Sequence, residues 1–197
     1  MSKGKRFSLG QGRGIGEGMM EALVAVCERI EIVGSVRRDR PFVHDVDLLL
    51  IPRMIEGERT DLAEAPGMVS LVDARLDELV AVGRLRLESR GAGAAGWKIR
   101  RYTHVKSGVP VDLYATTPAL WPVQMVIRTG SAEHNVYLCQ QALARGMRLH
   151  AGGEGLEGPG GELVPVETEK EVLDFIGVGW IEPSRREIRT RYQEPRR

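Results

Sequence analysis

Two aspartates, Asp45 and Asp47, lie one residue apart inside the apolar run VHDVDLLLIP, residues 43–52. In a β-strand, residues two apart share a face, so these carboxylates would lie side by side with Cα atoms roughly 6.5 Å apart. Like charges on a partly buried surface raise each other's pKa and cost stability unless a cation lies between them. Mg²⁺ prefers such oxygen ligands together with phosphate oxygens and water. The pair therefore predicts a divalent-metal site, and a surface D-x-D that caps a turn is the alternative.

A third acid occupies a similar run further along the chain. Asp112 lies in VPVDLYA, residues 109–115, again between residues that favour strands. If this strand neighbours the first, its carboxylate completes a ligand set for two Mg²⁺ or Mn²⁺ ions. Two strands with embedded acids favour metal binding over the turn-cap alternative. Asp45, Asp47 and Asp112 are therefore the candidate catalytic and metal-binding residues.

The segment GSVRR, residues 34–38, precedes the first pair of acids. Gly34 can expose backbone N–H groups, Ser35 offers a hydroxyl, and Arg37 and Arg38 offer guanidinium groups to an anion. A triphosphate bridged by Mg²⁺ suits this combination beside the acids. Taken alone, the segment also fits a turn with two solvated arginines.

The elements that position these residues follow from hydrophobic periodicity. The pattern predicts a helix over residues 16–29, strands over 30–35 and 42–52, and a second helix over 68–83 that Gly83 ends. Alternation then predicts an edge strand over 84–90 and a hairpin over 97–116. This order predicts an α+β lobe ending near Pro118.

A second lobe follows. It begins with the apolar run LWPVQMVIRTGS, residues 120–131, and continues in a helix over 132–146. A glycine-rich stretch at 151–163 leads to a short acidic helix near 167–177. The second lobe is therefore predicted to be a small α+β unit.

Composition limits the function classes but does not select one. With 197 residues and 42% hydrophobic residues the chain can bury a core, and a net charge of +1 gives no global attraction to nucleic acid. The sequence has no apolar run long enough for a membrane span, no secretion signal, and two cysteines without metal-ligand spacing. We therefore expect a cytoplasmic protein with no membrane partner.

Other motifs are weaker. GAGAAG, residues 91–96, has the G-x-G-x-x-G spacing, but it precedes a strand rather than a helix, so a flexible lead into the hairpin is preferred to a dinucleotide site. RGIGEG, residues 13–18, is a weak candidate for the glycine turn of a helix-hairpin-helix. The four histidines show no zinc spacing.

Together, GSVRR, VHDVDLLL, VDLY and RTGSAEHN, with the thumb-like stretches RTGSAEHNVYLCQQALARGMRL and LVPVETEKEVLDFIGVGWIEPSRRE, resemble the family X DNA polymerases. The resemblance spans residues 15–187 in the family's order. It implies an α+β fold: a nucleotidyltransferase palm over residues 1–118, with a mixed sheet and helices on one side, and a small α+β thumb over 119–197. No counterpart of the family's lyase and fingers segments precedes the palm, so a minimal palm-and-thumb form is expected.

The resemblance also implies roles. Asp45 and Asp47 would hold both metals, and Asp112 only the catalytic one, beside the primer 3′-hydroxyl. Ser35 and Arg38, with the Gly34 backbone, would bind the β and γ phosphates.

Thumb and hairpin residues receive roles in the same way. Gly130 and Ser131 would form a tight turn under the sugar, and Asn135 would reach the minor-groove edge of the incoming base. Four basic residues of the hairpin would meet DNA phosphates: Lys98, Arg100, Arg101 and Lys106.

Departures from the family pattern concern selectivity. Ile127 and Arg128 stand where the family usually has aromatic residues near the sugar. We therefore expect Arg128 to contact the nucleotide and to discriminate weakly against ribonucleotides, or else to turn to solvent or template phosphate. Cys139 replaces an arginine that often contacts the template, which puts template dependence in question.

The sequence thus predicts a monomeric, metal-dependent enzyme that adds nucleotides from nucleoside triphosphates to the primer 3′ end of primer–template or gapped DNA, in gap-filling repair. The alternatives are template-independent or ribonucleotide addition to a nucleic-acid end, a protein-modifying nucleotidylyl transferase of the antitoxin type, and a catalytically silent nucleic-acid clamp.

Overall fold

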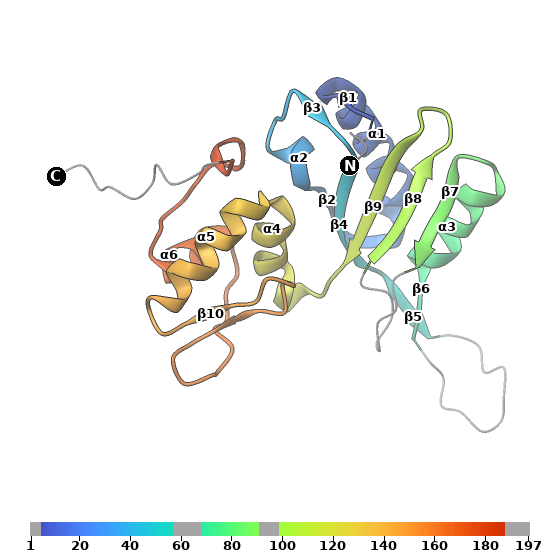
Figure 1. Ribbon diagram of the computed structural model, residues 1–197. Coiled ribbons are helices and arrows are strands. Elements are labelled where there is room, and N and C mark those ends of the chain that lie inside the picture. The colour runs from blue at the N-terminus through green and yellow to red at the C-terminus, as the bar shows by residue number, and fades with distance from the viewer. Residues whose placement is uncertain (1–4, 57–67, 91–98, 188–197) are drawn as a thin grey trace.

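A computed structural model describes residues 5–56, 68–90 and 99–187. Figure 1 shows a sheet lobe that contains the N-terminal half of the chain and a smaller lobe that contains the C-terminal half. In the described residues the sheet lobe is built on a five-stranded sheet in the order β2-β4-β9-β8-β7. The strands are β2 (Cys27–Ile32), β4 (Val46–Pro52), β7 (Leu85–Arg90), β8 (Ile99–His104) and β9 (Val109–Ala115).

The sheet is mixed, as predicted. β4 and β9 run parallel, and the other neighbouring pairs run antiparallel. In the parallel pair Asp47 lies opposite Asp112. The predicted hairpin is present as β8 and β9, and β7 is an edge strand as expected.

One face of the sheet carries the main core. Val46, Leu48 and Leu50 of β4 and Val111 and Leu113 of β9 are fully buried. They pack with buried residues of α1 (Leu9–Leu23) and α3 (Leu71–Ala81). Because side chains alternate across a strand, this burial sends Asp47 and Asp112 to the opposite face.

The first helix differs from its predicted span of 16–29. It begins at Leu9. The Ser8 hydroxyl accepts a hydrogen bond from the Gln11 backbone N–H, and Gln11 Oε1 accepts one from the Ser8 backbone N–H. This capping box fixes the start. The helix ends at Leu23, and a 3₁₀ turn (Val24–Val26) follows it. Strand β2 then begins at Cys27, because pairing with β4 overrides the helical period. The glycines of RGIGEG lie inside α1.

The remaining elements of the sheet lobe are short. Gly83, at φ +72°, follows α3 as predicted, since only glycine adopts this conformation without strain. Met68–Ser70, predicted to be helical, form a strand instead. The short elements are β1 (Phe7–Ser8), α2 (Gly34–Arg37), β3 (Phe42–Val43), β5 (Met54–Glu56) and β6 (Met68–Ser70).

The second lobe has a separate core. Its elements are 3₁₀ turns at Pro118–Leu120 and Pro183–Arg185, α4 (Trp121–Thr129), α5 (Ala132–Leu143), β10 (Arg148–Leu149), β11 (Leu156–Glu157) and α6 (Glu169–Ile176). Val126, Leu138 and Leu173 are among the fully buried residues of this core. The lobe is α+β, as predicted.

Helix α4 joins the two lobes. Trp121 and Met125 of α4 pack with Val33 and Leu49 of the sheet lobe, on the sheet face opposite to α1 and α3. Both cysteines are free. In the described part of the chain no helix is long and apolar enough to cross a membrane.

Candidate active site

The three predicted carboxylates come together on the open face of the sheet. Asp47 and Asp112 face each other across the parallel β4–β9 pair, and Asp45 lies immediately before β4. All three side chains are half-buried. Parallel pairing of β4 and β9 is therefore the step that turns two separate sequence motifs into one acidic site.

The acidic site carries more negative charge than its surroundings compensate. Burial, together with the neighbouring charges of Asp45 and Asp112, raises the pKa of Asp47 to about 7, although Tyr114 and Arg38 act in the opposite direction. Burial also raises the pKa of Asp112 above its ordinary value, against the charge of Arg101. Arg101 Nε lies 3.2 Å from Asp112 Oδ2. A divalent cation would relieve this repulsion.

The donor chemistry fits Mg²⁺ or Mn²⁺, although the carboxylates do not form a closed cage. Among the described residues no group of three or more His, Cys, Asp or Glu side chains is close enough to hold a metal ion alone. Mg²⁺ is typically bound by one or two carboxylates plus substrate phosphates and water. The residues therefore fit ions that arrive with a triphosphate.

Gly34 places the backbone of α2 directly against the acidic site. Its φ is +61°, and a Cβ at this position would collide with the Asp47 carboxylate. The neighbouring Val33 N–H donates to the Asp47 carbonyl at 2.9 Å. Glycine is required here for close approach as well as for backbone conformation.

Next to Asp45 is a pocket of about 390 Å³ that contains the predicted phosphate ligands. Ser35 and Arg38 line it, and within the described residues the buried Ser35 hydroxyl has no hydrogen-bond partner. Its other lining residues are Arg6, Arg40, Pro41, Phe42, Val43 and His44. A buried hydroxyl without a partner beside arginines suits an anionic oxygen.

Arg37 has a different environment from the one predicted. Its guanidinium donates to both Glu169 carboxylate oxygens, at 2.9 and 2.5 Å, and to the Thr129 hydroxyl at 2.5 Å. Arg186, which is fully buried, donates to the same carboxylate at 2.8 Å. Arg37 therefore joins the two lobes and does not face an anion near the acids.

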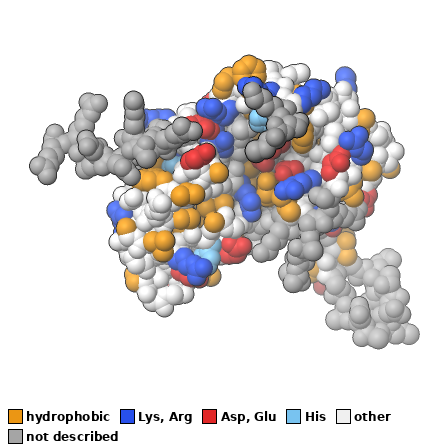
Figure 2. All heavy atoms as spheres, viewed as in Figure 1, with side chains coloured by type: hydrophobic (Ala, Val, Ile, Leu, Met, Phe, Trp, Pro, Cys, Tyr) orange, Lys and Arg blue, Asp and Glu red, His pale blue; other side chains and the backbone are white. Residues whose placement is uncertain are grey.

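Glu169 and Arg186 were not identified from the sequence. Glu169 follows Thr168, whose hydroxyl caps α6, so its position alone indicates only an acid in the first turn of a helix. Figure 2 shows side chains of both charges gathered where the two lobes meet.

The predicted tight turn after α4 is present. Gly130 has φ +71°, and a Cβ there would lie 3.0 Å from Arg38 Nη1. The Ser131 hydroxyl caps α5 by accepting from the His134 N–H. Asn135 Nδ2 donates to the Ile127 carbonyl at 2.8 Å, while its Oδ1 is buried and without a partner in the described residues. The turn thus lies against Arg38, and in the helix that follows it the described residues leave the Asn135 amide oxygen without a partner.

Known proteins resemble this arrangement in two ways. Residues 124–187 match the family model of the DNA polymerase beta thumb. The structure matches Leishmania infantum polymerase beta in a ternary P/T complex, with a TM-score of 0.70 and 20% identity over 93% of this chain and 77% of that chain. It also matches the same polymerase in a ternary gap complex, with a TM-score of 0.68 and 20% identity over 93% and 71% of the two chains.

The chain has the polymerase beta fold. This confirms the resemblance to family X polymerases that the sequence predicted. No curated protein matches the sequence significantly. We call the two lobes palm and thumb from here on; the matched thumb model begins within α4, close to the predicted boundary at residue 119.

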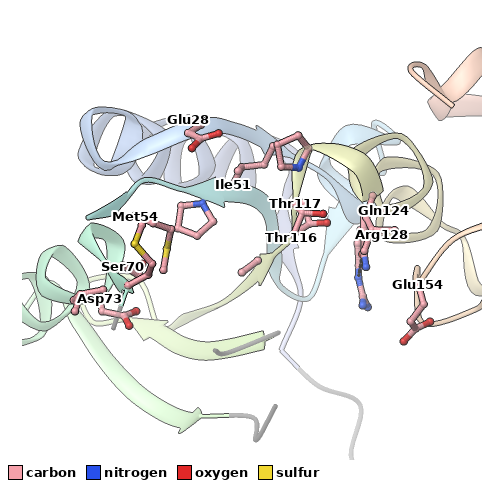
Figure 3. A pocket seen from close by; sticks show the side chains of 16 residues that line it. Glu28, Ile51, Met54, Ser70, Asp73, Thr116, Thr117, Gln124, Arg128 and Glu154 are labelled. Atoms are coloured by element: carbon pink, nitrogen blue, oxygen red, sulfur yellow. Dashed lines mark hydrogen bonds between the residues drawn. The ribbon is translucent and has the colours of Figure 1, made fainter. Parts of the chain in front are cut away.

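Arg128 of the thumb lies near the acidic site, but its side chain is already engaged. It donates to Gln124 Oε1 at 3.0 Å and to the Gly152 carbonyl at 3.1 Å, and its guanidinium lies 4.3 Å from the centre of the Tyr114 ring. Tyr114 also hydrogen-bonds to Asp47. Figure 3 shows Arg128 and Gln124 side by side on α4 at one wall of a pocket of about 710 Å³. Arg128 therefore connects the thumb to the acidic face through Tyr114.

The four basic residues predicted to contact DNA do not share one surface. Lys98 lies outside the described residues. Arg101 and Lys106 are exposed, and Arg101 is on the face of Asp112. Arg100 contradicts its predicted role, because its side chain is only 6% exposed and pairs with Asp73 at 2.7 Å on the other face. Strand alternation separates the two neighbouring arginines.

Proposed function

We propose that the protein is a metal-dependent DNA nucleotidyltransferase that adds nucleoside monophosphates from triphosphates to a primer 3′-hydroxyl, in gap-filling repair synthesis. One observation carries the proposal. Asp47 lies opposite Asp112 in the β4–β9 pair, next to Asp45 and to the pocket of Ser35 and Arg38, within a polymerase beta fold. A silent clamp would not need three carboxylates held together at a cost in stability.

Each palm residue has a role in this proposal. Asp45 and Asp47 would hold two Mg²⁺ or Mn²⁺ ions and Asp112 one of them, and these ions would lower the pKa of the 3′-hydroxyl and neutralise charge on the triphosphate. Ser35 and Arg38 bind phosphate oxygens. Gly34 lets the backbone approach Asp47 closely, so a phosphate bound there would lie beside the carboxylates that would hold the ions.

Thumb residues position the nucleotide, and two exposed basic residues of the palm hairpin contact the DNA. Gly130 and Ser131 lie under the sugar, and the unpaired Oδ1 of Asn135 accepts a hydrogen bond from the nucleotide or from a bridging water. Arg101 and Lys106 contact DNA phosphates. A monomeric state and a cytoplasmic location remain predictions from the sequence.

A single-nucleotide insertion assay tests this function. The purified protein should extend a primer on a one-nucleotide gap and on an open primer–template when Mg²⁺ or Mn²⁺ is present, and EDTA should abolish extension. Addition should follow the template base. Extension of single-stranded primers without base preference would favour terminal addition instead, and no extension of any substrate with either metal would refute the proposal.

Sugar selection is tested in the same assay. The resemblance predicts that Arg128 lies beside the sugar, where the family usually has an aromatic ring, and its guanidinium lies 4.3 Å from the centre of the Tyr114 ring. We therefore expect dGTP to be preferred over GTP by no more than about 2 to 3 kcal/mol in transition-state binding. A preference above about a thousandfold (roughly 4 kcal/mol), or an Arg128→Ala change that leaves the ratio unchanged, would contradict this expectation.

A further inference from the structure

An anionic group of the thumb, the Glu187 carboxylate, contacts two of the arginines that line the predicted phosphate pocket of the palm. Glu187 follows the last 3₁₀ turn of the thumb and reaches α2 of the palm. Its Oε1 accepts from Arg38 Nε and lies 3.7 Å from Arg40 Nε. Two guanidinium groups therefore converge on one carboxylate oxygen at the edge of the pocket that Ser35 lines.

The geometry around Arg40 is built by the chain. The Arg40 N–H donates to the Ser35 carbonyl at 3.1 Å, which folds the segment after α2 back onto Ser35. Asp39, the adjacent acid, points away and pairs with Arg13 of α1 at 2.6 Å. Arg40 is thus left beside Arg38, and the only acid among the pocket-lining residues is Asp45.

The exposure of the three groups separates their roles. The Arg38 side chain is 13% exposed, Glu187 27% and Arg40 47%. Arg38 is also held by a bond to the Thr129 carbonyl, so it stays in place if the carboxylate leaves. Glu187 is more exposed than Arg38 and no second hydrogen bond of its side chain is seen among the described residues, so in this pair the carboxylate is the partner that can move.

We propose that Glu187 occupies the place of a terminal phosphate in the nucleotide-free protein, and that Arg40 is a further phosphate ligand which this carboxylate covers. The inference rests on the proposed function, because the incoming anion is the triphosphate of the substrate. A phosphate oxygen replaces the carboxylate oxygen between the two guanidinium groups. Glu187 therefore competes with the substrate and lowers its apparent affinity.

The opposite reading is that Glu187 is a latch between palm and thumb that keeps Arg38 in position. The two readings predict opposite signs when the charge is removed. If Glu187 competes with the substrate, removing its charge leaves the arginines free and tightens triphosphate binding. If Glu187 holds Arg38 in position, removing its charge weakens triphosphate binding or leaves it unchanged.

The experiment measures binding of dATP with Mg²⁺, and separately of inorganic tripolyphosphate, to the full-length protein by calorimetry at fixed ionic strength without DNA. We expect Glu187→Gln to tighten both by about three- to tenfold. Arg40→Ala should weaken both by a similar factor. Thermal unfolding of each variant checks that it is folded.

Matched controls separate local from general charge effects. Glu182→Gln removes another carboxylate of the same segment. This carboxylate contacts Trp180 and does not line the pocket. Arg86→Ala removes an exposed arginine that pairs with Glu88 on β7, the strand at the opposite edge of the sheet from β2. Neither control should change binding of either probe by more than about twofold, since exposed pairs distant from the pocket contribute little.

The outcomes distinguish the inference from the function on which it rests. If the wild type binds dATP and neither Glu187→Gln nor Arg40→Ala changes its affinity beyond the controls, the inference fails and the proposed function stands. Weaker binding by Glu187→Gln identifies the latch and also overturns the inference. If neither wild type nor Glu187→Gln binds dATP or tripolyphosphate, both proposals fall.

Discussion

Two clusters in this molecule contain partly buried carboxylates, and they differ in how the negative charge is paired. At the palm–thumb junction, the Glu169 carboxylate receives bonds from Arg37 and Arg186. On the open face of the sheet, Asp45, Asp47 and Asp112 lie together, and Arg101 is the cation paired with them among the described ion pairs. The junction pairs its carboxylate internally, whereas the acidic site leaves its carboxylates to be paired by something that binds.

The pKa shifts of the two clusters differ accordingly. Burial would raise the pKa of Glu169, but the hydrogen bonds and charges of Arg37 and Arg186 outweigh it and lower the pKa. The pKa values of Asp47 and Asp112 are raised instead. The comparison indicates that compensated charge holds the two lobes together, while uncompensated charge prepares a ligand site.

The largest effect is expected from Asp112→Asn. The change removes a metal ligand without changing side-chain volume, so nucleotide addition should fall at least about a thousandfold, or roughly 4 kcal/mol. The free energy of unfolding should stay within about 1 kcal/mol of wild type, because the carboxylate is not needed by the fold. Single-nucleotide insertion and urea unfolding measure the two quantities. Asp39→Asn, which removes an exposed carboxylate, is the control, and a rate for Asp112→Asn within tenfold of wild type would contradict the assignment.

Glu169→Ala, in contrast, should mainly lower the free energy of unfolding. It leaves the guanidinium groups of Arg37 and Arg186 without their carboxylate, and removing one partner of a buried pair costs about 3–5 kcal/mol of stability. Asp174→Ala on the same helix breaks an exposed pair with Lys170 and should cost no more than about 0.5 kcal/mol. Urea unfolding of both variants tests the difference. Equal losses would show that the junction is no more than a surface ion pair.

A smaller effect concerns Asp47 in metal-free protein. Its pKa is about 7 in the folded state against an ordinary value of 3.8, so between these values the folded state binds more protons than the unfolded state. The free energy of unfolding should therefore fall as the pH rises from about 4 to about 7. Asp47→Asn should remove this fall and be more stable by roughly 1–3 kcal/mol at pH 8.

Urea unfolding in EDTA at about pH 4, 6 and 8 measures this dependence, within the range over which such groups titrate. Added Mg²⁺ should reduce the gain of Asp47→Asn at the highest pH, because the ion relieves the same repulsion. A gain that is equal at the lowest and highest pH would be inconsistent with titration of Asp47.

The smallest effect is expected from Arg101→Gln. Arg101 lowers the pKa of Asp112, so its removal should raise that pKa and move the acidic limb of the pH–activity profile upward by less than about one unit. Activity at the optimum should fall by no more than about threefold, the size of a weak exposed pair. Arg86→Gln on β7 is the control, because Arg86 pairs with Glu88 away from the acids. An unchanged acidic limb would show that Arg101 does not act on Asp112.

The sequence predicted those features that depend on neighbouring residues. Alternation in VHDVDLLLIP places Asp45 and Asp47 on one face with Leu48 and Leu50 on the other, and the structure keeps this division. Gly83 ends its helix as expected. The first helix was predicted too late in the chain because its capping box at Ser8 was not recognised and because pairing with β4 overrides helical periodicity at Cys27.

Arg100 and Arg101 are neighbours whose faces the sequence pattern predicts only in part. Alternation requires them to face opposite sides, but it does not say which of them shares a face with Asp112. The register of β8 against β9 decides this by placing Arg101 opposite Asp112, and Arg100 is then buried against Asp73.

By itself the sequence determined the candidate residues for the proposed chemistry, because spacing along a strand or turn fixes faces and local conformation. Tertiary structure alone decided which of those residues meet. Asp112 joins Asp47 only through the parallel β4–β9 pair, and Arg37 and Arg38, neighbours in the sequence, take different partners in Glu169 and Glu187. The physical reason is that contacts between distant segments depend on strand register and lobe packing, which no local spacing encodes.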